Sequence, residues 1–91
     1  MSEIRKTYEV EGVAVSIRDA TQMPFSQWLV PSGGEISAAL QATGWTAEKF
    51  AKESGISSRT VRRWINEETE IPYAVWAMLC AAAGWGHIWE S

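Results

Sequence analysis

The spacing of apolar residues changes along this chain of 91 residues. Between Thr7 and Ile17 the apolar side chains stand two positions apart, with a break at Gly12. This predicts one or two short β-strands and a bulge or turn at that glycine. After the segment Val30–Gly34 the apolar positions recur every three or four residues, as they do in helices. Two strands alone are marginally stable in water, so we expect them to pack on the helices or on another copy of the chain.

Capping signals divide the chain from residue 32 onwards into four predicted helices. Ser32 is followed three residues later by Glu35, which is the spacing of a capping box. Pro72 stands at the predicted first position of the fourth helix, which runs to Gly84, and a single turn around His87–Trp89 follows. The predicted N-caps of the first three helices are Ser32, Thr46 and Ser57, and the glycines that close the first two are Gly44 and Gly55.

The predicted fourth helix is apolar on every side, so it requires burial on more than one face. One stripe is expected to fill the core: Val75, Met78, Leu79 and Ala82. The other stripe, with two tryptophans that follow it, is expected to form a dimer interface: Tyr73, Trp76, Cys80, Ala83, Trp85 and Trp89. In the alternative interpretation, the N-terminal β-arm covers this second stripe within one molecule.

Charge is distributed unevenly over the sequence. The chain has 8 basic and 11 acidic residues, for a net charge of −3, which argues against a histone-like protein that binds DNA by bulk charge. Residues 57–66 nevertheless contain arginines and no acid, whereas residues 67–91 contain glutamates and neither Lys nor Arg. This asymmetry allows one basic and one acidic face.

Candidate chemistry is sparse. Cys80 is the only cysteine and stands in an apolar run, so we expect a buried thiol in a reducing, cytoplasmic setting. His87 is the only histidine and has no cysteine or acid at metal-ligand spacing, so neither a metal nor a cofactor is expected. The sequence contains no catalytic signature, no signal peptide and no apolar run of membrane-spanning length. These features favour a protein that is not an enzyme and does not enter the membrane.

Residues 46–66 carry the most specific functional signal. Two short predicted helices are joined by a turn at Gly55, and the second helix contains Arg59, Arg62 and Arg63. A helix-turn-helix presents a basic recognition helix to the major groove of DNA in this way. Helix pairs with short glycine turns also occur in bundles that do not bind DNA, so the geometry alone leaves both interpretations open.

The same segment resembles the lambda-repressor/Cro (Xre-type) family. The family pattern is Thr-x-x-x-hydrophobic-Ala-x-x-x-Gly-hydrophobic-Ser-x-x-Thr-hydrophobic-x-x-Trp. The chain matches this pattern at Thr46, Phe50, Ala51, Gly55, Ile56, Ser57, Thr60, Val61 and Trp64. The resemblance extends over about residues 36–89, because residues 84–89 are similar to the family's short final helix. It implies a mainly α fold, a lambda-repressor-like helix-turn-helix bundle of four to five helices with a short N-terminal β-arm. A weaker resemblance, at the Pro72-Tyr73 helix start, is to small phage regulators of the anti-CRISPR-associated type.

The family resemblance also implies DNA-contacting positions. Base-reading positions fall on Ser58, Arg59 and Arg63. Phosphate-contacting positions fall on Thr46, Ser57, Arg62 and Asn66, and Lys49 adds a charge nearby. An arginine can donate two hydrogen bonds to guanine, which predicts half-sites that contain G.

The chain departs from the family at two places. Ala47 stands where many members have Gln, so one contact to DNA is expected to be missing. Ile65-Asn66-Glu67 replaces the usual Glu-Asn-Gly after the tryptophan, so the loop that leaves the third helix is expected to differ. Glu67, Glu68 and Glu70 would repel phosphates unless they point away from DNA.

The sequence therefore predicts an N-terminal β-arm and linker over residues 1–31, with Gly33 and Gly34 as linker residues, and a helix-turn-helix DNA-binding domain over residues 32–91. The predicted function is that of a cytoplasmic, homodimeric, sequence-specific regulator. We expect a repressor of phage or mobile-element type that binds a pseudo-palindromic operator in double-stranded DNA. The alternative is a protein-interaction module, such as an antitoxin or adaptor, that uses the apolar fourth helix or the β-arm to bind a protein partner.

Overall fold

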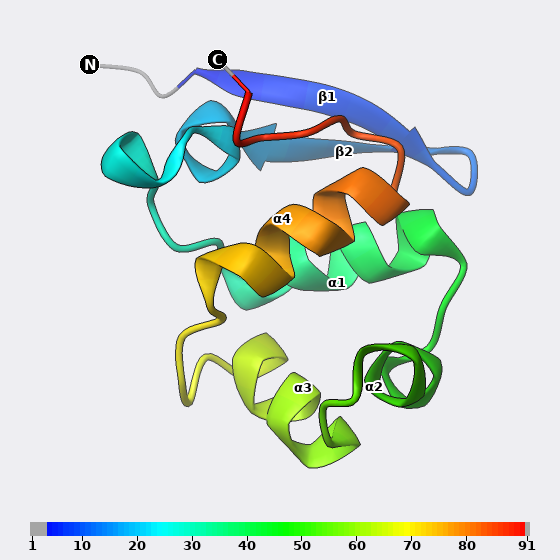
Figure 1. Ribbon diagram of the computed structural model, residues 1–91. Coiled ribbons are helices and arrows are strands. Elements are labelled where there is room, and N and C mark those ends of the chain that lie inside the picture. Colours follow the sequence, from blue (N-terminus) through cyan, green and yellow to red (C-terminus); the bar gives the residue numbers. More distant parts are fainter. Residues whose placement is uncertain (1–3, 91) are drawn as a thin grey trace.

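A computed structural model describes residues 4–90. The elements in chain order are β1 (Arg5–Val10), β2 (Val13–Arg18), the 3-10 helices η1 (Asp19–Gln22) and η2 (Phe25–Gln27), α1 (Gly33–Thr43), α2 (Ala47–Ser54), α3 (Ser58–Ile65) and α4 (Tyr73–Ala82). In Figure 1 the hairpin lies above a layer formed by α1 and α4, and α2 and α3 lie below that layer. The fold is thus the expected helix-turn-helix bundle with an N-terminal β-hairpin. No helix in the described residues is long and apolar enough to cross a bilayer.

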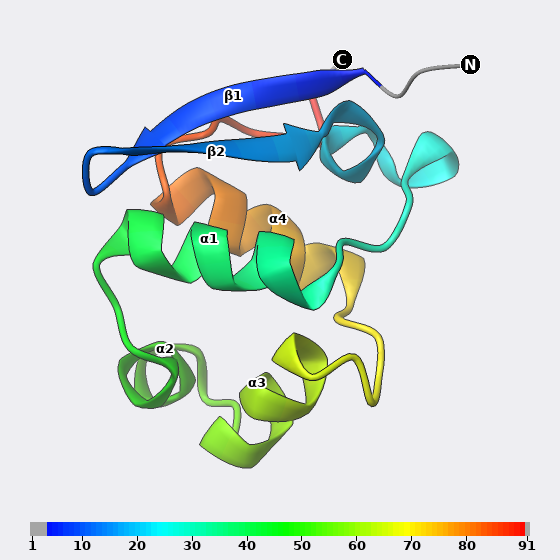
Figure 2. The same ribbon diagram turned by 180° about the vertical axis from the view of Figure 1, so that it is seen from behind.

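The N-terminal strands form one antiparallel hairpin. Val10 pairs with Val13 across a two-residue turn, in which Glu11 and Gly12 have φ of 51° and 79°. Two successive positive φ angles are typical of the hairpin turn whose twist matches that of the strands. The predicted turn at Gly12 is confirmed. Figure 2 shows the hairpin lying along α1 and α4, on which Val10 and Ile17 are buried.

The predicted caps of α1, α2 and α3 are confirmed. Ser32 Oγ accepts a hydrogen bond from the Glu35 N–H at 3.2 Å, and the Glu35 carboxylate accepts one from the Ser32 N–H at 2.8 Å. Gly44 and Gly55 take the left-handed conformation that ends α1 and α2. Thr46 and Ser57 cap α2 and α3 through their hydroxyl oxygens.

Two details differ from the sequence-based prediction. Gly33 and Gly34 form the first turn of α1 and are not a linker. Pro72 is the N-cap of α4, one position before the helix begins. The single turn predicted around His87–Trp89 is confirmed, and a hydrogen bond of 3.0 Å from the Glu90 N–H to the His87 carbonyl closes it.

The face of α4 that was predicted to bind a second copy is largely buried within the molecule. Trp76 and Cys80 are fully buried, whereas Met78, which was predicted to fill the core, is 42% exposed. The prediction was wrong because α4 is apolar on all its faces. The pattern of apolar residues therefore does not show which face packs against the N-terminal segment. The alternative, in which the β-arm covers this stripe, agrees with the structure.

The N-terminal segment contacts most of that stripe directly. The Trp76 indole donates a hydrogen bond of 2.6 Å to the Thr21 carbonyl, the Tyr73 hydroxyl donates one of 3.0 Å to the Met23 carbonyl, and Trp85 stacks on Tyr8. The remaining residues of the predicted dimer interface are Ala83, which is partly buried, and Trp89, which is half exposed. Of the residues predicted for the core, Leu79 is buried, Val75 is partly buried, and Met78 and Ala82 are exposed.

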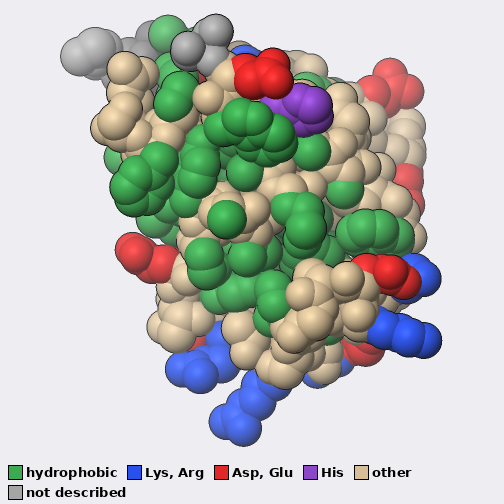
Figure 3. All heavy atoms as spheres, viewed as in Figure 1, with side chains coloured by type: hydrophobic (Ala, Val, Ile, Leu, Met, Phe, Trp, Pro, Cys, Tyr) green, Lys and Arg blue, Asp and Glu red, His purple; other side chains and the backbone are tan. Residues whose placement is uncertain are grey.

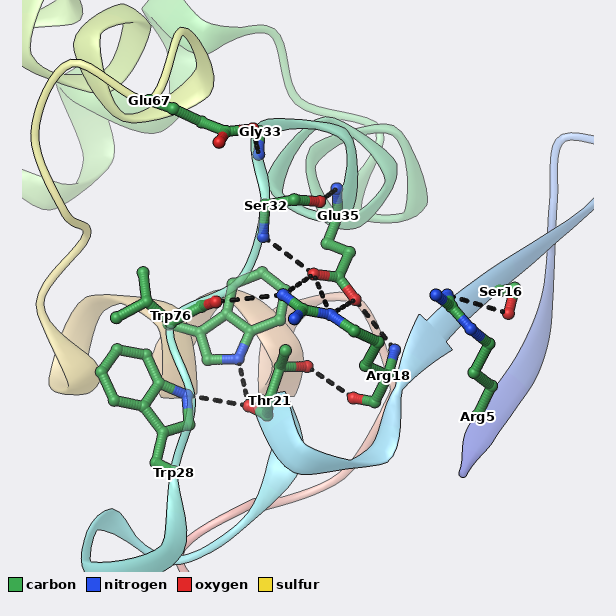
Figure 4. Close-up of polar contacts among 11 residues, drawn as sticks. Arg5, Ser16, Arg18, Thr21, Trp28, Ser32, Gly33, Glu35, Glu67 and Trp76 are labelled. Carbon is green, nitrogen blue, oxygen red and sulfur yellow. Dashed lines mark hydrogen bonds and ion pairs between the residues drawn. The ribbon is translucent and has the colours of Figure 1, made fainter. Parts of the chain in front are cut away.

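Glu35 joins the hairpin to the helices (Figure 4). Its carboxylate accepts hydrogen bonds from the backbone N–H groups of Arg18 and Ser32, both at 2.8 Å. It also pairs with the Arg18 guanidinium at 2.9 Å. Burial by itself would raise the pKa of Glu35, but the hydrogen bonds and the charge of Arg18 outweigh burial and lower the pKa below its ordinary value of 4.5.

We predict that Glu35→Gln lowers the free energy of unfolding by about 2–3 kcal/mol, because the partly buried Arg18 guanidinium loses its charged partner and the backbone donors lose a carboxylate acceptor. Urea unfolding followed by tryptophan fluorescence measures this change. The matched control is Glu53→Gln, which removes an exposed i,i+4 ion pair with Lys49. We expect the control to cost about 0.5 kcal/mol or less.

The same pair of variants gives a dependence on pH. Because the pKa of Glu35 is lowered on folding, its contribution to stability is complete above pH 4.5 and is lost as the pH falls through the lower folded-state pKa. The difference between the parent protein and Glu35→Gln should therefore shrink in that acidic range. A difference that stays constant with pH would contradict the charge-based role of Glu35.

Candidate nucleic-acid interface

Core packing fixes the positions of α2 and α3. Phe50 and Ala51 of α2 and Val61 and Trp64 of α3 are all buried in one cluster. The Ile56 N–H donates to the Ala51 carbonyl at 3.1 Å and completes the end of α2 before the turn. The helix pair is therefore held by its apolar side, and α3 lies at the edge of the molecule opposite the hairpin (Figure 1).

The outer side of α3 is basic. Arg59, Arg62 and Arg63 are all exposed, and Ser58 is partly buried. Figure 3 shows basic side chains gathered along the lower edge of the molecule, where Figure 1 places α2 and α3. Arg59 and Arg63 stand four residues apart and so share one side of the helix. The structure thus brings the three predicted base-reading residues together on one short helix.

The arginines of α3 differ in their electrostatic partners. Arg62 pairs with Glu48 of α2, and Lys49 pairs with Glu53 at 2.8 Å. In the part of the chain that the structure describes, neither Arg59 nor Arg63 forms an ion pair with a carboxylate. The two predicted base-reading arginines therefore carry charge that no acid among residues 4–90 neutralises, whereas the two cations predicted to contact phosphate are paired on the surface. Exposed pairs of this kind contribute about 1 kcal/mol or less and exchange readily for another anion.

The predicted phosphate-contacting hydroxyls also cap helices. Thr46 Oγ1 accepts from the Lys49 N–H at 3.0 Å and keeps its own hydrogen available for another acceptor. Ser57 Oγ accepts from the Thr60 N–H at 3.1 Å and lies 2.8 Å from the Thr60 hydroxyl, so these two hydroxyls share a hydrogen bond. Asn66 is exposed at the end of α3. All five predicted phosphate-contacting residues lie on the α2–α3 pair.

The loop after α3 directs one of its acids away from the arginines. Glu67 has φ of 60°, a left-handed conformation that costs a side chain about 1 kcal/mol, where the resembled family has Gly. Its carboxylate accepts a hydrogen bond of 2.8 Å from the Gly33 N–H at the start of α1 (Figure 4). Glu67 therefore links the end of α3 to α1, while Glu68 and Glu70 remain exposed.

Gly33 is a structural residue that sequence reasoning misassigned. A Cβ atom at this position would overlap the carbonyl oxygen of Ile65, the last residue of α3. The start of α1 and the end of α3 therefore approach each other backbone to backbone. One sequence signal could have indicated this contact. Gly33 lies inside the capping box, where no turn requires a glycine, so its lack of a side chain points to a close approach by another segment. The Glu48–Arg62 pair and the Glu67–Gly33 bond had no sequence signal, because both join residues that are distant along the chain.

Known proteins resemble the chain over most of its length. A sequence model of the helix-turn-helix family matches residues 36–84. Two proteins named transcriptional repressor protein KorC, both from Escherichia coli, are 45% and 43% identical to it over 78 and 79 residues. The alignments cover 82% and 84% of this chain and 92% and 93% of the repressors. No solved structure matches the chain.

We predict that Gly33→Ala destabilises the protein by about 1–3 kcal/mol, because the added methyl forces the backbones of α1 and α3 apart. The neighbouring glycine provides a matched control. A Cβ atom at Gly34 would meet only the Ser32 hydroxyl, at 3.8 Å, so Gly34→Ala should be neutral or stabilising by about 0.5–1 kcal/mol. Thermal unfolding of both variants measures the contrast. Equal effects would show that the α1–α3 contact is not tight.

Proposed function

The chain belongs to the helix-turn-helix family, and from this membership we propose that it is a dimeric transcriptional repressor that binds an inverted repeat. That it is a DNA-binding regulator and not an enzyme follows from the family. The observation that carries the finer proposal is the pair Arg59 and Arg63, exposed and without a carboxylate partner among the described residues, on a helix whose opposite side is anchored in the core.

In the proposed complex α3 lies in the major groove. Arg59 and Arg63 each donate a pair of hydrogen bonds to guanine, and Ser58 contacts a neighbouring base. The hydroxyls of Thr46 and Ser57, the amide of Asn66 and the N–H groups at the starts of α2 and α3 bind phosphates and fix the register of the helix. Arg59 and Arg63 stand one turn apart on α3. The operator half-site is therefore expected to contain two G positions, one for each arginine.

The ion pairs on α2 and α3 set a condition for phosphate binding. To bind phosphate, Arg62 must release Glu48 and Lys49 must release Glu53, so that a phosphate replaces each carboxylate. Both pairs are exposed, so the exchange costs little, and the released carboxylates remain in solvent. Several phosphate contacts in each subunit should make affinity fall steeply with salt concentration, as counterions are released from DNA.

Repression in this proposal is steric. Two copies place their recognition helices about 34 Å apart, one turn of the duplex, so an inverted repeat matches the two-fold symmetry of the dimer. The bound dimer then excludes polymerase from a promoter that overlaps the operator. The names of the two similar repressors support this direction of regulation. A cytoplasmic protein of phage or mobile-element type would fit the same proposal.

The interaction-module hypothesis now rests on a different surface. Trp76 of α4, the helix that the sequence offered to a protein partner, is fully buried in the folded chain. An exposed apolar stripe of α4 remains available to a second molecule. A repressor that also binds a protein partner would use α3 and that stripe together.

We predict that Arg59→Ala and Arg63→Ala each lose about 1–3 kcal/mol of preference for the operator over unrelated DNA, because each removes a bidentate contact to guanine. Arg62→Ala should weaken binding to all sequences about equally and reduce the salt dependence by about one ion. Fluorescence anisotropy with operator and scrambled duplexes at several salt concentrations measures both quantities.

The matched control for these variants is Lys52→Ala. It removes one exposed positive charge from α2, at a position outside the proposed contacts. This variant should leave the ratio of operator to scrambled affinity unchanged. Retained specificity in both Arg59→Ala and Arg63→Ala would refute base reading by α3, and a selective loss in Arg62→Ala would refute its phosphate role.

A further inference from the structure

The arginines of α3 differ in whether an acid neutralises them. Arg62 forms an ion pair with Glu48, which stands in the first turn of α2. Among residues 4–90, no carboxylate pairs with Arg59 or Arg63. The neutralised arginine is therefore the one that is proposed to contact phosphate, and the other two are those that are proposed to read bases.

The Glu48–Arg62 pair lies on the surface that is proposed to face DNA. The side chains of Glu48 and Arg62 are 60% and 54% exposed, so both are within reach of a bound anion. Thr46, two residues before Glu48, is the N-cap of α2 and a proposed phosphate contact. In Figure 3 acidic side chains lie beside basic ones on the side where Figure 1 places α2. A carboxylate therefore stands where the proposed complex brings phosphates.

We propose that Glu48 is an affinity-limiting residue, which occupies the guanidinium of Arg62 and so weakens binding to DNA of every sequence. This inference rests on the DNA-binding function proposed above and names a residue that sets the strength of that binding. Glu48 itself contacts no DNA. It acts on a phosphate contact alone, because Arg59 and Arg63 have no acid to displace among residues 4–90.

Two electrostatic effects make Glu48 weaken DNA binding. Arg62 must give up one anion to gain another, so the phosphate contact yields only the difference between the two pairs. The displaced carboxylate then remains close to the phosphates, and like charges repel each other. Both effects weaken as the salt concentration rises, because exposed charges are screened over about 10 Å at 0.1 M salt.

A structural role for Glu48 would have the opposite effect on DNA binding. A negative charge in the first turn of α2 stabilises that helix through its dipole, and the ion pair could also orient Arg62 toward phosphate. In either role, loss of the charge would weaken DNA binding, whereas loss of an affinity-limiting charge strengthens it. The fold needs little help from Glu48, since α2 is already held by the Thr46 cap and by the buried Phe50 and Ala51.

The expected consequence is a shorter residence on unrelated DNA. Phosphate contacts supply nearly all of the affinity for non-specific sites, which greatly outnumber an operator in a genome. Neutralisation of Arg62 by Glu48 reduces that affinity. The hydrogen bonds of Arg59 and Arg63 to bases are not subject to the same competition, so the sequence-dependent part of the binding energy is retained.

Glu48→Gln tests the inference, because it removes the charge and keeps the shape of the side chain. We expect this variant to bind a scrambled duplex about 5-fold more tightly than the parent at about 0.1 M salt, which is the most that one exposed ion pair normally contributes. The gain should shrink as salt is raised. Affinity for an operator recovered by selection from random DNA should rise by a similar factor, so that the ratio of the two affinities stays nearly constant. Fluorescence anisotropy with both duplexes measures these quantities.

A double-mutant cycle with Arg62→Ala shows whether Glu48 acts through Arg62. In the Arg62→Ala background, Glu48→Gln should change the affinity for the scrambled duplex by less than about 2-fold, because no ion pair remains to be broken. The matched control is Glu68→Gln, which removes an exposed carboxylate that pairs with no cation among the described residues. Its effect should also stay below about 2-fold, since only a screened, unpaired charge is lost.

The possible outcomes separate the role of Glu48 from the function. Unchanged or weaker binding by Glu48→Gln, or an equal gain in the Arg62→Ala background or in Glu68→Gln, would overturn the inference even if the parent binds its operator specifically. A parent that binds all duplexes alike, and that gains affinity through Glu48→Gln, would support the limiting role of Glu48 and refute sequence-specific repression. Absence of binding to any duplex by both the parent and Glu48→Gln would refute both proposals.

Discussion

The buried carboxylate of Glu35 is the interaction on which the arrangement of the layers depends. It caps its own helix, accepts the backbone N–H at the end of β2 and neutralises the Arg18 guanidinium. A hairpin of two strands is marginal by itself, and these bonds attach it where its apolar residues cover α1 and α4. Once the hairpin is attached, η1 presents the Thr21 carbonyl to the indoles of Trp28 and Trp76 (Figure 4).

The same end of α1 positions the recognition helix. One residue beyond Ser32, Gly33 allows backbone contact with Ile65 and donates its N–H to Glu67. Glu35 and Gly33 therefore connect α1 to the hairpin and to α3 within a single helical turn. Since α3 is held by its buried Val61 and Trp64 and by these contacts at its end, its arginines are presented from a rigid base. Base recognition benefits from such rigidity, because little entropy is lost on binding.

Local signals made much of this structure predictable. Helix caps depend on residues three or four positions apart, so Ser32 with Glu35, Gly44, Thr46, Gly55 and Ser57 were located from sequence. The orientation of α4 was not predictable, because α4 is apolar on every side and the groups that contact its inner face, such as the Thr21 carbonyl at Trp76 and the Met23 carbonyl at Tyr73, are distant in sequence. The role of Gly33 was missed for the same reason, since its partner Ile65 is on another helix. In the candidate site, the arginines were found from the pattern of α3, whereas the ion pair of Arg62 with Glu48 was not.

Selection of double-stranded DNA from a random pool by the purified protein, at near-physiological salt, tests most directly whether α3 reads a DNA sequence. The proposed function predicts enrichment of an inverted repeat with G in each half-site and with half-site centres about one helical turn apart. Failure of a folded protein to enrich any sequence would contradict base reading by Arg59 and Arg63. Enrichment of a single site without symmetry would support base reading and contradict the dimer.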